Sequence, residues 1–172
     1  GYAPEGAVRS VTGDKIAGPL RNEMTQALAA ADRANNAVLE TRSGRWTVQG
    51  DPLEGALIVA ARKAGLEREA LDARFDRVAE VPFSSERKLM STVHTDTEQA
   101  EHLLAFTKGA PDVLLARCSR EQVGEDNQPL TTERRQQIHA ANEALAGDAL
   151  RTLAVAARHL PRAEFDCAAC DE

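Results

Sequence analysis

Aromatic residues are scarce in this sequence. One tryptophan, one tyrosine and four phenylalanines make up only 3% of the 172 residues. A hydrophobic core must therefore be filled mainly by alanine, leucine and valine. Cysteine is scarce too, because three cysteines in a chain of this length are too few for a disulfide scaffold and suit a reducing compartment.

Several features that identify common classes of protein are absent. No stretch approaches the ~20 consecutive apolar residues of a membrane span. No G-x-G-x-x-G is present, and Gly13 and Gly18, which have P-loop spacing, are followed by Pro19-Leu20 where lysine and Ser/Thr are required. The histidines are scattered and no H-E-x-x-H occurs, so we expect no metal site.

The composition is otherwise that of an ordinary globular domain, with 42% hydrophobic and 28% charged residues. The 21 basic and 27 acidic residues give a net charge of −6, which argues against binding of nucleic acid through bulk charge. We expect residues 1–172 to form one monomeric domain with a poorly ordered tail over 161–172. Because the chain does not begin with methionine, we expect it to be a piece of a longer protein. Cys167 and Cys170 have ligand spacing, but we interpret them as two reduced thiols in the tail.

Hydrophobic periodicity predicts a mixture of helices and strands. An extended entry segment and a polar loop are expected over 1–19 and 119–130. Helices are expected over 20–33, 52–64, 67–73, 109–115 and 132–146, and strands over 37–40, 45–48, 75–83, 89–94, 103–107 and 149–157. Neighbouring strands in the middle of the chain favour an antiparallel sheet, so the predicted fold class is α+β or α/β.

The start of the second predicted helix has strong capping chemistry. Asp51 suits the N-cap position and Pro52 the first helical position. Glu54, three residues after the cap, can reach back to the backbone amide of Asp51 in a capping box.

Four short segments follow one another in a characteristic order: G-D-P-L-E-G-A-L at 50–57, P-F-S-S-E-R-K-L-M-S at 82–91, K-G-A-P-D at 108–112 and L-R-T-L-A-V-A at 150–156. At these residues the sequence resembles the nucleotide-binding (N) domain of cation-transporting P-type ATPases, in the calcium and sodium/potassium pump branch. The resemblance covers nearly the whole chain. It implies a twisted antiparallel sheet flanked by helices, inserted within the phosphorylation domain of a membrane pump.

The resemblance also implies an ATP pocket, and it assigns these residues to it: Glu54, Phe83, Ser85, Lys88, Lys108, Gly109 and Arg151. Phe83 would stack on the adenine, and Glu54 would accept a hydrogen bond from its exocyclic amine. Lys88 and Lys108 would line the pocket and meet the ring and the phosphates. Arg151 would contact the phosphates.

The sequence departs from the family pattern at several positions. Ser85 stands where animal calcium pumps carry an arginine, and Asp112 replaces a glutamate. The phosphorylated aspartate of the family's D-K-T-G-T is absent, since Asp14-Lys15 is followed by Ile16. We therefore expect a cytoplasmic domain that binds ATP without hydrolysing it. Its partners would be the phosphorylation and actuator domains of the same pump, and Mg²⁺ would be held mainly by the phosphorylation domain.

Residue chemistry alone leaves an alternative open at each position. A nucleotide site without a P-loop needs an aromatic face for the base and cations for the phosphates. Phe83 could instead be a core phenylalanine, and Glu54 a plain helix cap. Lys88 and Lys108 could be surface lysines.

Arg151, as a single charge inside a predicted apolar strand, could be half of an internal ion pair. For the whole chain, the alternative to ATP binding is a regulatory or protein-interaction module of the same fold. A stand-alone hydrolase is disfavoured, because the sequence shows no nucleophile–base pair and no metal cluster.

Overall fold

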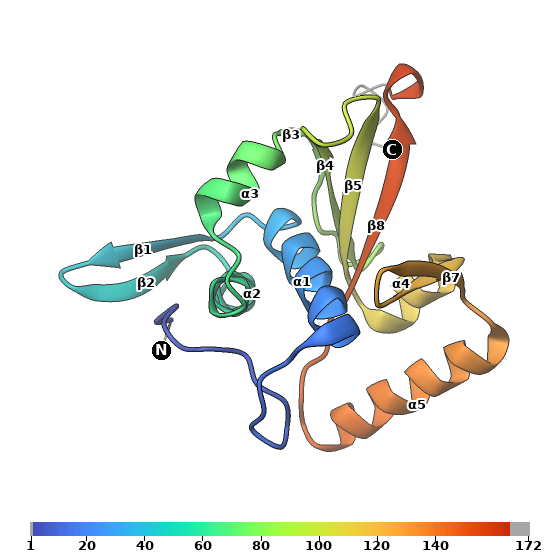
Figure 1. Cartoon of the computed structure of the whole chain (residues 1–172), viewed down its shortest axis with the longest axis horizontal. Helices are drawn as coiled ribbons and strands as arrows, with labels where there is room; N and C mark the ends of the chain where they lie inside the picture. Colours follow the sequence, from blue (N-terminus) through green and yellow to red (C-terminus); the bar gives the residue numbers. More distant parts are fainter. Residues whose placement is uncertain (1, 166–172) are drawn as a thin grey trace.

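A four-stranded antiparallel sheet in the order β3-β4-β5-β8 is the centre of the fold (Figure 1). The computed structural model describes residues 2–165. The strands of this sheet are β3 (Arg77–Val81), β4 (Leu89–Thr95), β5 (His102–Gly109) and β8 (Ala154–Pro161). The predicted α+β class and the antiparallel sheet are confirmed.

Helices pack on this sheet and extend from it. They are α1 (Gly18–Arg33), α2 (Pro52–Lys63), α3 (Arg68–Arg74), α4 (Pro111–Arg117), α5 (Thr132–Gly147) and the 3₁₀ turn Arg162–Glu164. Helix α1 packs against β5 and β8, and α2 packs against α1. Helix α5 lies apart from the sheet (Figure 1) and has no buried residue.

The hydrophobic core lies where α1 and α3 meet β5. Its buried cluster is formed by Ala30, Ala34, Leu71, Phe75, Leu104 and Phe106. The two phenylalanine rings of this cluster contact each other edge to face, with their centroids 5.4 Å apart. Alanine supplies the helix side of the core, so α1 can approach the sheet closely.

Two hairpins stand outside the central sheet, β1 (Val38–Arg42) with β2 (Arg45–Gln49) and β6 (Arg120–Val123) with β7 (Asp126–Pro129). The second hairpin corrects the prediction of a polar loop over 119–130. None of the residues of β6 and β7 is buried, so these strands carry no hydrophobic alternation that a sequence could reveal. Their backbone pairing and a turn at Gly124, with φ of 61°, hold them together.

The last strand also differs from its prediction, because β8 begins at Ala154 and not at Ala149. Ala149 has a φ of 58° and follows the end of α5. The amides of Ala149 and Leu150 donate to Ala146 O and Leu145 O at 3.0 Å each, which is a Schellman cap. The apolar residues at 149 and 150 therefore end a helix, and the strand starts later.

The C-terminal region is described only in part. Residues 161–165 of the expected tail contain the end of β8 and the 3₁₀ turn. Cys167 and Cys170 lie outside the described residues. Within residues 2–165, no helix is both long enough and apolar enough to cross a membrane.

Candidate functional site

Most of the candidate residues gather at one end of the central sheet. Because neighbouring strands are antiparallel, the end of β3, the start of β4, the end of β5 and the start of β8 lie together. The register pairs Val81 with Ser91, Leu89 with Gly109, and Gly109 with Ala154. We call this the site end, and it holds Phe83, Ser85, Lys88, Lys108, Gly109 and Arg151.

Glu54 reaches the site end from α2. Asp51 caps this helix, since Oδ1 accepts from the amides of Leu53 and Glu54 at 2.8 and 3.1 Å, so the predicted N-cap is confirmed. The predicted capping box is wrong. The Glu54 carboxylate accepts from Lys108 Nζ at 2.6 Å and from the backbone amide of Asn36 at 3.0 Å. These partners lie toward the sheet and the end of α1, and they hold the carboxylate away from its own helix cap.

Lys108 is buried, so the alternative of a surface lysine is wrong at this position. Strand alternation puts it on the same side of β5 as Leu104 and Phe106, which belong to the core. The side chains of Lys108 and Glu54 are only 9% and 16% exposed. Each charge therefore compensates the burial of the other, and removing either would leave an unpaired buried charge.

A tight turn at 84–88 presents side chains to solvent between β3 and β4. The Lys88 amide donates to Ser84 O at 2.7 Å, and the Arg87 amide donates to Ser84 Oγ at 3.1 Å. Lys88 adopts a φ of 56°, which is uncommon for a residue with a side chain. Ser85 and Lys88 are both exposed. The sequence alone did not identify Ser84, whose hydroxyl and carbonyl oxygens accept the hydrogen bonds that stabilise this turn.

Gly109 has a steric role at the site end. A Cβ at this position would lie 2.2 Å from the carbonyl oxygen of Lys88, which is backbone and cannot move aside cheaply. The next residue, Ala110, donates its amide to the same oxygen at 3.1 Å. The glycine therefore lets the 84–88 turn dock against the end of β5.

Phe83 and Arg151 both differ from the alternatives that were open for them. Phe83 follows the end of β3 and is 60% exposed, so it is not a core phenylalanine. Arg151 precedes β8 and is exposed, so it is not a charge inside an apolar strand. Among residues 2–165, no ion pair or side-chain hydrogen bond of Arg151 is found, and the internal ion pair is wrong. An exposed aromatic ring with exposed cations is the combination that a base and its phosphates require.

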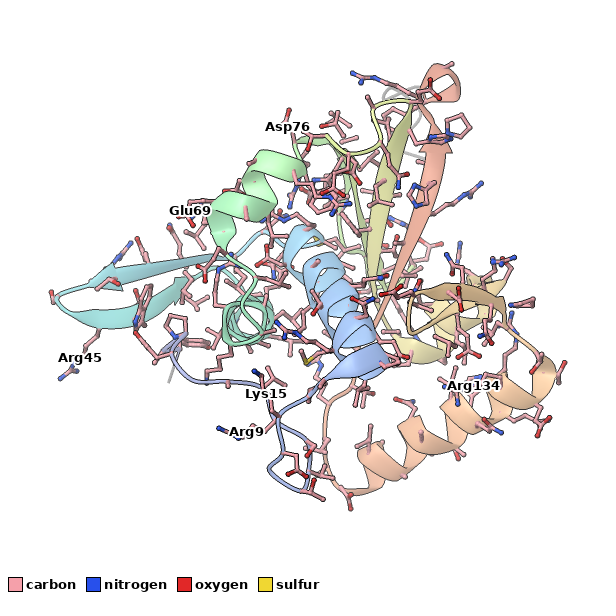
Figure 2. All side chains as sticks on the ribbon, viewed as in Figure 1. Arg9, Lys15, Arg45, Glu69, Asp76 and Arg134 are labelled. Atoms are coloured by element: carbon pink, nitrogen blue, oxygen red, sulfur yellow. The ribbon has the colours of Figure 1, made fainter. Side chains whose placement is uncertain are left out.

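A large cavity lies elsewhere. It has a volume of about 770 Å³, and its lining includes Glu69 of α3 and Asp76, both labelled in Figure 2, but none of the candidate residues. Much of its charge is already paired. Asp32 lies 2.6 Å from Arg33 and 3.1 Å from Arg62, and Arg33 lies 2.7 Å from Asp72. Among the residues that the structure describes, no cluster of three or more His, Cys, Asp and Glu could hold a metal ion.

Comparison with known proteins places this chain in a family. Residues 23–172 match the family model described as the P-type ATPase, cytoplasmic domain N. The chain belongs to this family, and the resemblance seen in the four sequence segments is confirmed. The expected cytoplasmic location of the domain agrees with the family description.

Similar curated proteins are named as transporting ATPases. A calcium-transporting ATPase of Bacillus subtilis is 35% identical over 164 residues, which cover 95% of this chain and 18% of that protein. A probable cation-transporting ATPase F of Mycobacterium tuberculosis is 35% identical over 156 residues, covering 90% of this chain and 16% of that protein. A calcium-transporting ATPase of Listeria monocytogenes is 40% identical over 112 residues, covering 65% and 12%. The chain therefore spans less than a fifth of the length of these relatives.

Proposed function

We propose that this chain is the ATP-binding domain of a cation-transporting P-type ATPase. In the full-length pump it would present the γ-phosphate of ATP to an aspartate of the phosphorylation domain, with the actuator domain as a further partner. The observation that carries the proposal is Phe83, a ring 60% exposed at the sheet end that also holds Lys88, Lys108 and Arg151. An exposed ring offers a face on which a base can stack, and the cations beside it can meet the phosphates.

Each group at the site end has a part in the proposed complex. Phe83 stacks on the adenine, because an exposed ring offers a flat, polarizable face to the base. Glu54 accepts from the exocyclic amine. Its carboxylate has about four lone-pair directions, so the bonds from Lys108 and Asn36 leave room for another donor. Lys88 and Arg151, both exposed, meet the phosphates, together with Ser85 from the same turn as Lys88.

The proposed domain binds ATP without turning it over. The sequence contains no D-K-T-G-T, so the aspartate that accepts the phosphoryl group in this family is not in this chain. What these residues contribute is positioning, which supplies much of the catalysis in phosphoryl transfer. Mg²⁺ bound to the phosphates would be held mainly by the phosphorylation domain.

Titration with ATP, followed by amide and side-chain chemical shifts, tests the proposal. We expect shift changes at residues 54, 83, 85, 88, 108, 109 and 151, with none at 96–101 at the opposite end of the sheet. Phosphate release should stay at the level of buffer with ATP and Mg²⁺. If ATP leaves the shifts at the site end unchanged, the protein-interaction module becomes the better interpretation. Phosphate release that copurifies with the chain would contradict a role in binding alone.

A further inference from the structure

Arg77, at the start of β3, holds the connection between α1 and β1. Its Nη2 donates to the carbonyl oxygens of Arg33 and Asn35 at 2.8 and 2.6 Å. Its Nη1 donates to Asn36 Oδ1 at 2.6 Å and to Glu80 Oε2 at 3.0 Å. One guanidinium on β3 therefore holds three residues at the end of α1 and in the connection, which are Arg33, Asn35 and Asn36.

The same connection holds Glu54 from its other side. The Asn36 amide donates to Glu54 Oε2 at 3.0 Å, and Asn35 Nδ2 donates to the backbone oxygen of Glu54 at 2.9 Å. Asn36 Nδ2 donates to Glu80 Oε1 at 2.7 Å, so the Asn36 side chain is also anchored on β3. The connection therefore links Arg77 to the Glu54 carboxylate through Asn36.

The two partners of the Glu54 carboxylate hold it in different ways. Lys108 supplies a compact charge on a flexible stem, which attracts an oxygen without fixing its direction. The Asn36 amide is part of the backbone, so it defines a direction as long as the backbone itself is fixed. A guanidinium presents its donors in a rigid planar fork, which an ammonium cannot reproduce. The orientation of the carboxylate thus depends on Arg77.

We infer that Arg77 is a positioning residue for recognition of the base. By holding the Asn36 amide against Glu54 Oε2, Arg77 orients the carboxylate that distinguishes a 6-amino purine from a 6-oxo purine. This inference rests on the proposed function, in which Glu54 accepts from the adenine amine. A 6-oxo purine presents a carbonyl oxygen at the same place, which cannot donate to a carboxylate.

Arg135 of α5 offers a matched control. Its Nη1 and Nη2 donate to the carbonyl oxygens of Leu115 and Cys118 at the end of α4, as Arg77 does at the end of α1. Both arginines therefore cap the carbonyl end of a helix. The structure shows no bond from Arg135 to Glu54 or its partners among residues 2–165.

The experiment compares Arg77→Met, Arg77→Lys and Arg135→Met with the parent chain. Hydrogen exchange of the Asn36 amide is measured without nucleotide, and dissociation constants are measured for ATP and for ITP, whose base is a 6-oxo purine. For Arg77→Met we expect the Asn36 amide to exchange about tenfold faster. We also expect the preference for ATP over ITP to fall about three- to tenfold, the range for one weakened hydrogen bond. Arg77→Lys should lie between this variant and the parent, and Arg135→Met should change neither quantity.

The two readouts separate failure of the inference from failure of the proposed function. Unchanged Asn36 exchange in Arg77→Met overturns the inference whatever the nucleotides do. So does faster exchange with an unchanged preference for ATP, or an equal loss of ATP and ITP affinity. If the parent chain binds neither nucleotide, or binds both equally, the proposed function of Glu54 fails and the inference falls with it. If Arg77→Met is too unstable to measure, Arg77→Lys alone decides through the same two quantities.

Discussion

The two ends of the central sheet differ in how many of their charged side chains are paired with each other. At the end away from the site, Arg74 donates to both carboxylate oxygens of Asp96 at 3.0 Å each and lies 2.9 Å from Glu98. The Glu98 amide also donates to Asp96 at 3.0 Å. Burial alone would raise the pKa of Asp96, but the Arg74 guanidinium, the Glu98 amide and the charge of His159 together outweigh burial and lower that pKa. The charged groups named here are therefore bonded to one another, and we call this the closed end.

At the site end, by contrast, several side chains are exposed to solvent. Lys88, Arg151 and Phe83 are exposed, and the buried Lys108 and Glu54 are held in place at its base. Both ends belong to one sheet and are joined by the same strands, so position at a sheet end does not by itself make a site. The difference predicts that changes to the exposed residues of the site end alter nucleotide affinity, whereas changes at the opposite end alter stability.

The largest effect on affinity is expected at Phe83. Loss of aromatic stacking costs ~1–3 kcal/mol per base, so Phe83→Ala should weaken ATP about 5- to 150-fold. Phe83→Leu, which keeps most of the volume and removes the π-face, should lose most of this affinity as well. Stability should change by less than about 1 kcal/mol, because a side chain this exposed contributes little to the core. Titration calorimetry and urea unfolding measure the two quantities.

Phe75 is the matched control, because it is buried at 7% exposure in the core cluster. Phe75→Leu should lower stability by about 1–2 kcal/mol and leave the ATP affinity of the folded protein unchanged. If Phe83→Leu binds ATP like the parent, stacking at Phe83 is wrong. The contrast between the two sheet ends would then lose its main support.

A pH-dependent loss of stability is expected from His94, which lies in β4. Burial, with the nearby charges of Arg77 and Arg33, lowers its pKa from the ordinary 6.5 to about 4. The unfolded chain therefore takes up a proton between these values that the folded chain does not. Stability is full above pH 6.5 and falls as the pH falls toward 4, by about 2–3 kcal/mol between pH 7 and 4.5.

Urea unfolding across this pH range measures the effect, and His94→Gln should remove most of the slope. Asp96, whose pKa is lowered, contributes a loss of the same sign but at lower pH. A parent chain equally stable at pH 7 and 4.5 would contradict the neutral, buried histidine.

A smaller loss of stability is expected at the closed end. Arg74→Met takes both of the Arg74 hydrogen bonds from Asp96, whose side chain is 2% exposed. Because Arg74 itself is partly exposed, the cost should be about 1–2 kcal/mol, below that of a fully buried pair. ATP affinity should not change, as measured by the same calorimetry. A change in affinity comparable to that of Phe83→Ala would show that the two ends are coupled.

The sequence predicted the elements whose apolar residues have a clear period, such as α1, α2, β4 and β5, and it predicted the N-cap at Asp51. It failed at one hairpin and at one helix end, although α5, which also has no buried residue, was predicted. No residue of the strands β6 and β7 is buried, and the Schellman cap at Ala149 rests on backbone hydrogen bonds, with an alanine where glycine is the usual signal. Local sequence pattern does not reveal a conformation that is stabilised by backbone pairing and by side chains from distant segments, such as the Glu23 carboxylate that accepts from the Gly124 amide.

For the site, the resemblance supplied the residues but not their surroundings. Lys108 could have been placed in the core from its alternation with Leu104 and Phe106. Asn36 and Arg77 carry no local signal, because their importance arises from contacts between segments distant in sequence. Arg151 was expected inside a strand only because the start of β8 was misplaced.

The smallest effect is expected at Arg151, and it tests the comparison most directly. Arg151→Ala removes an exposed cation, so stability should stay within about 0.5 kcal/mol of the parent. A partly solvated contact with phosphate should be worth about two- to tenfold in ATP affinity, with the affinity for adenosine unchanged.

Arg158, exposed within β8 and farther from the site end, is the control, and Arg158→Ala should change the affinity for neither ligand. Salt should weaken ATP binding less in Arg151→Ala than in the parent, because one screened contact is missing. Equal losses for ATP and adenosine would move Arg151 from the phosphates to the base, whereas no loss for either would leave Lys88 as the exposed cation of the site end that meets the phosphates.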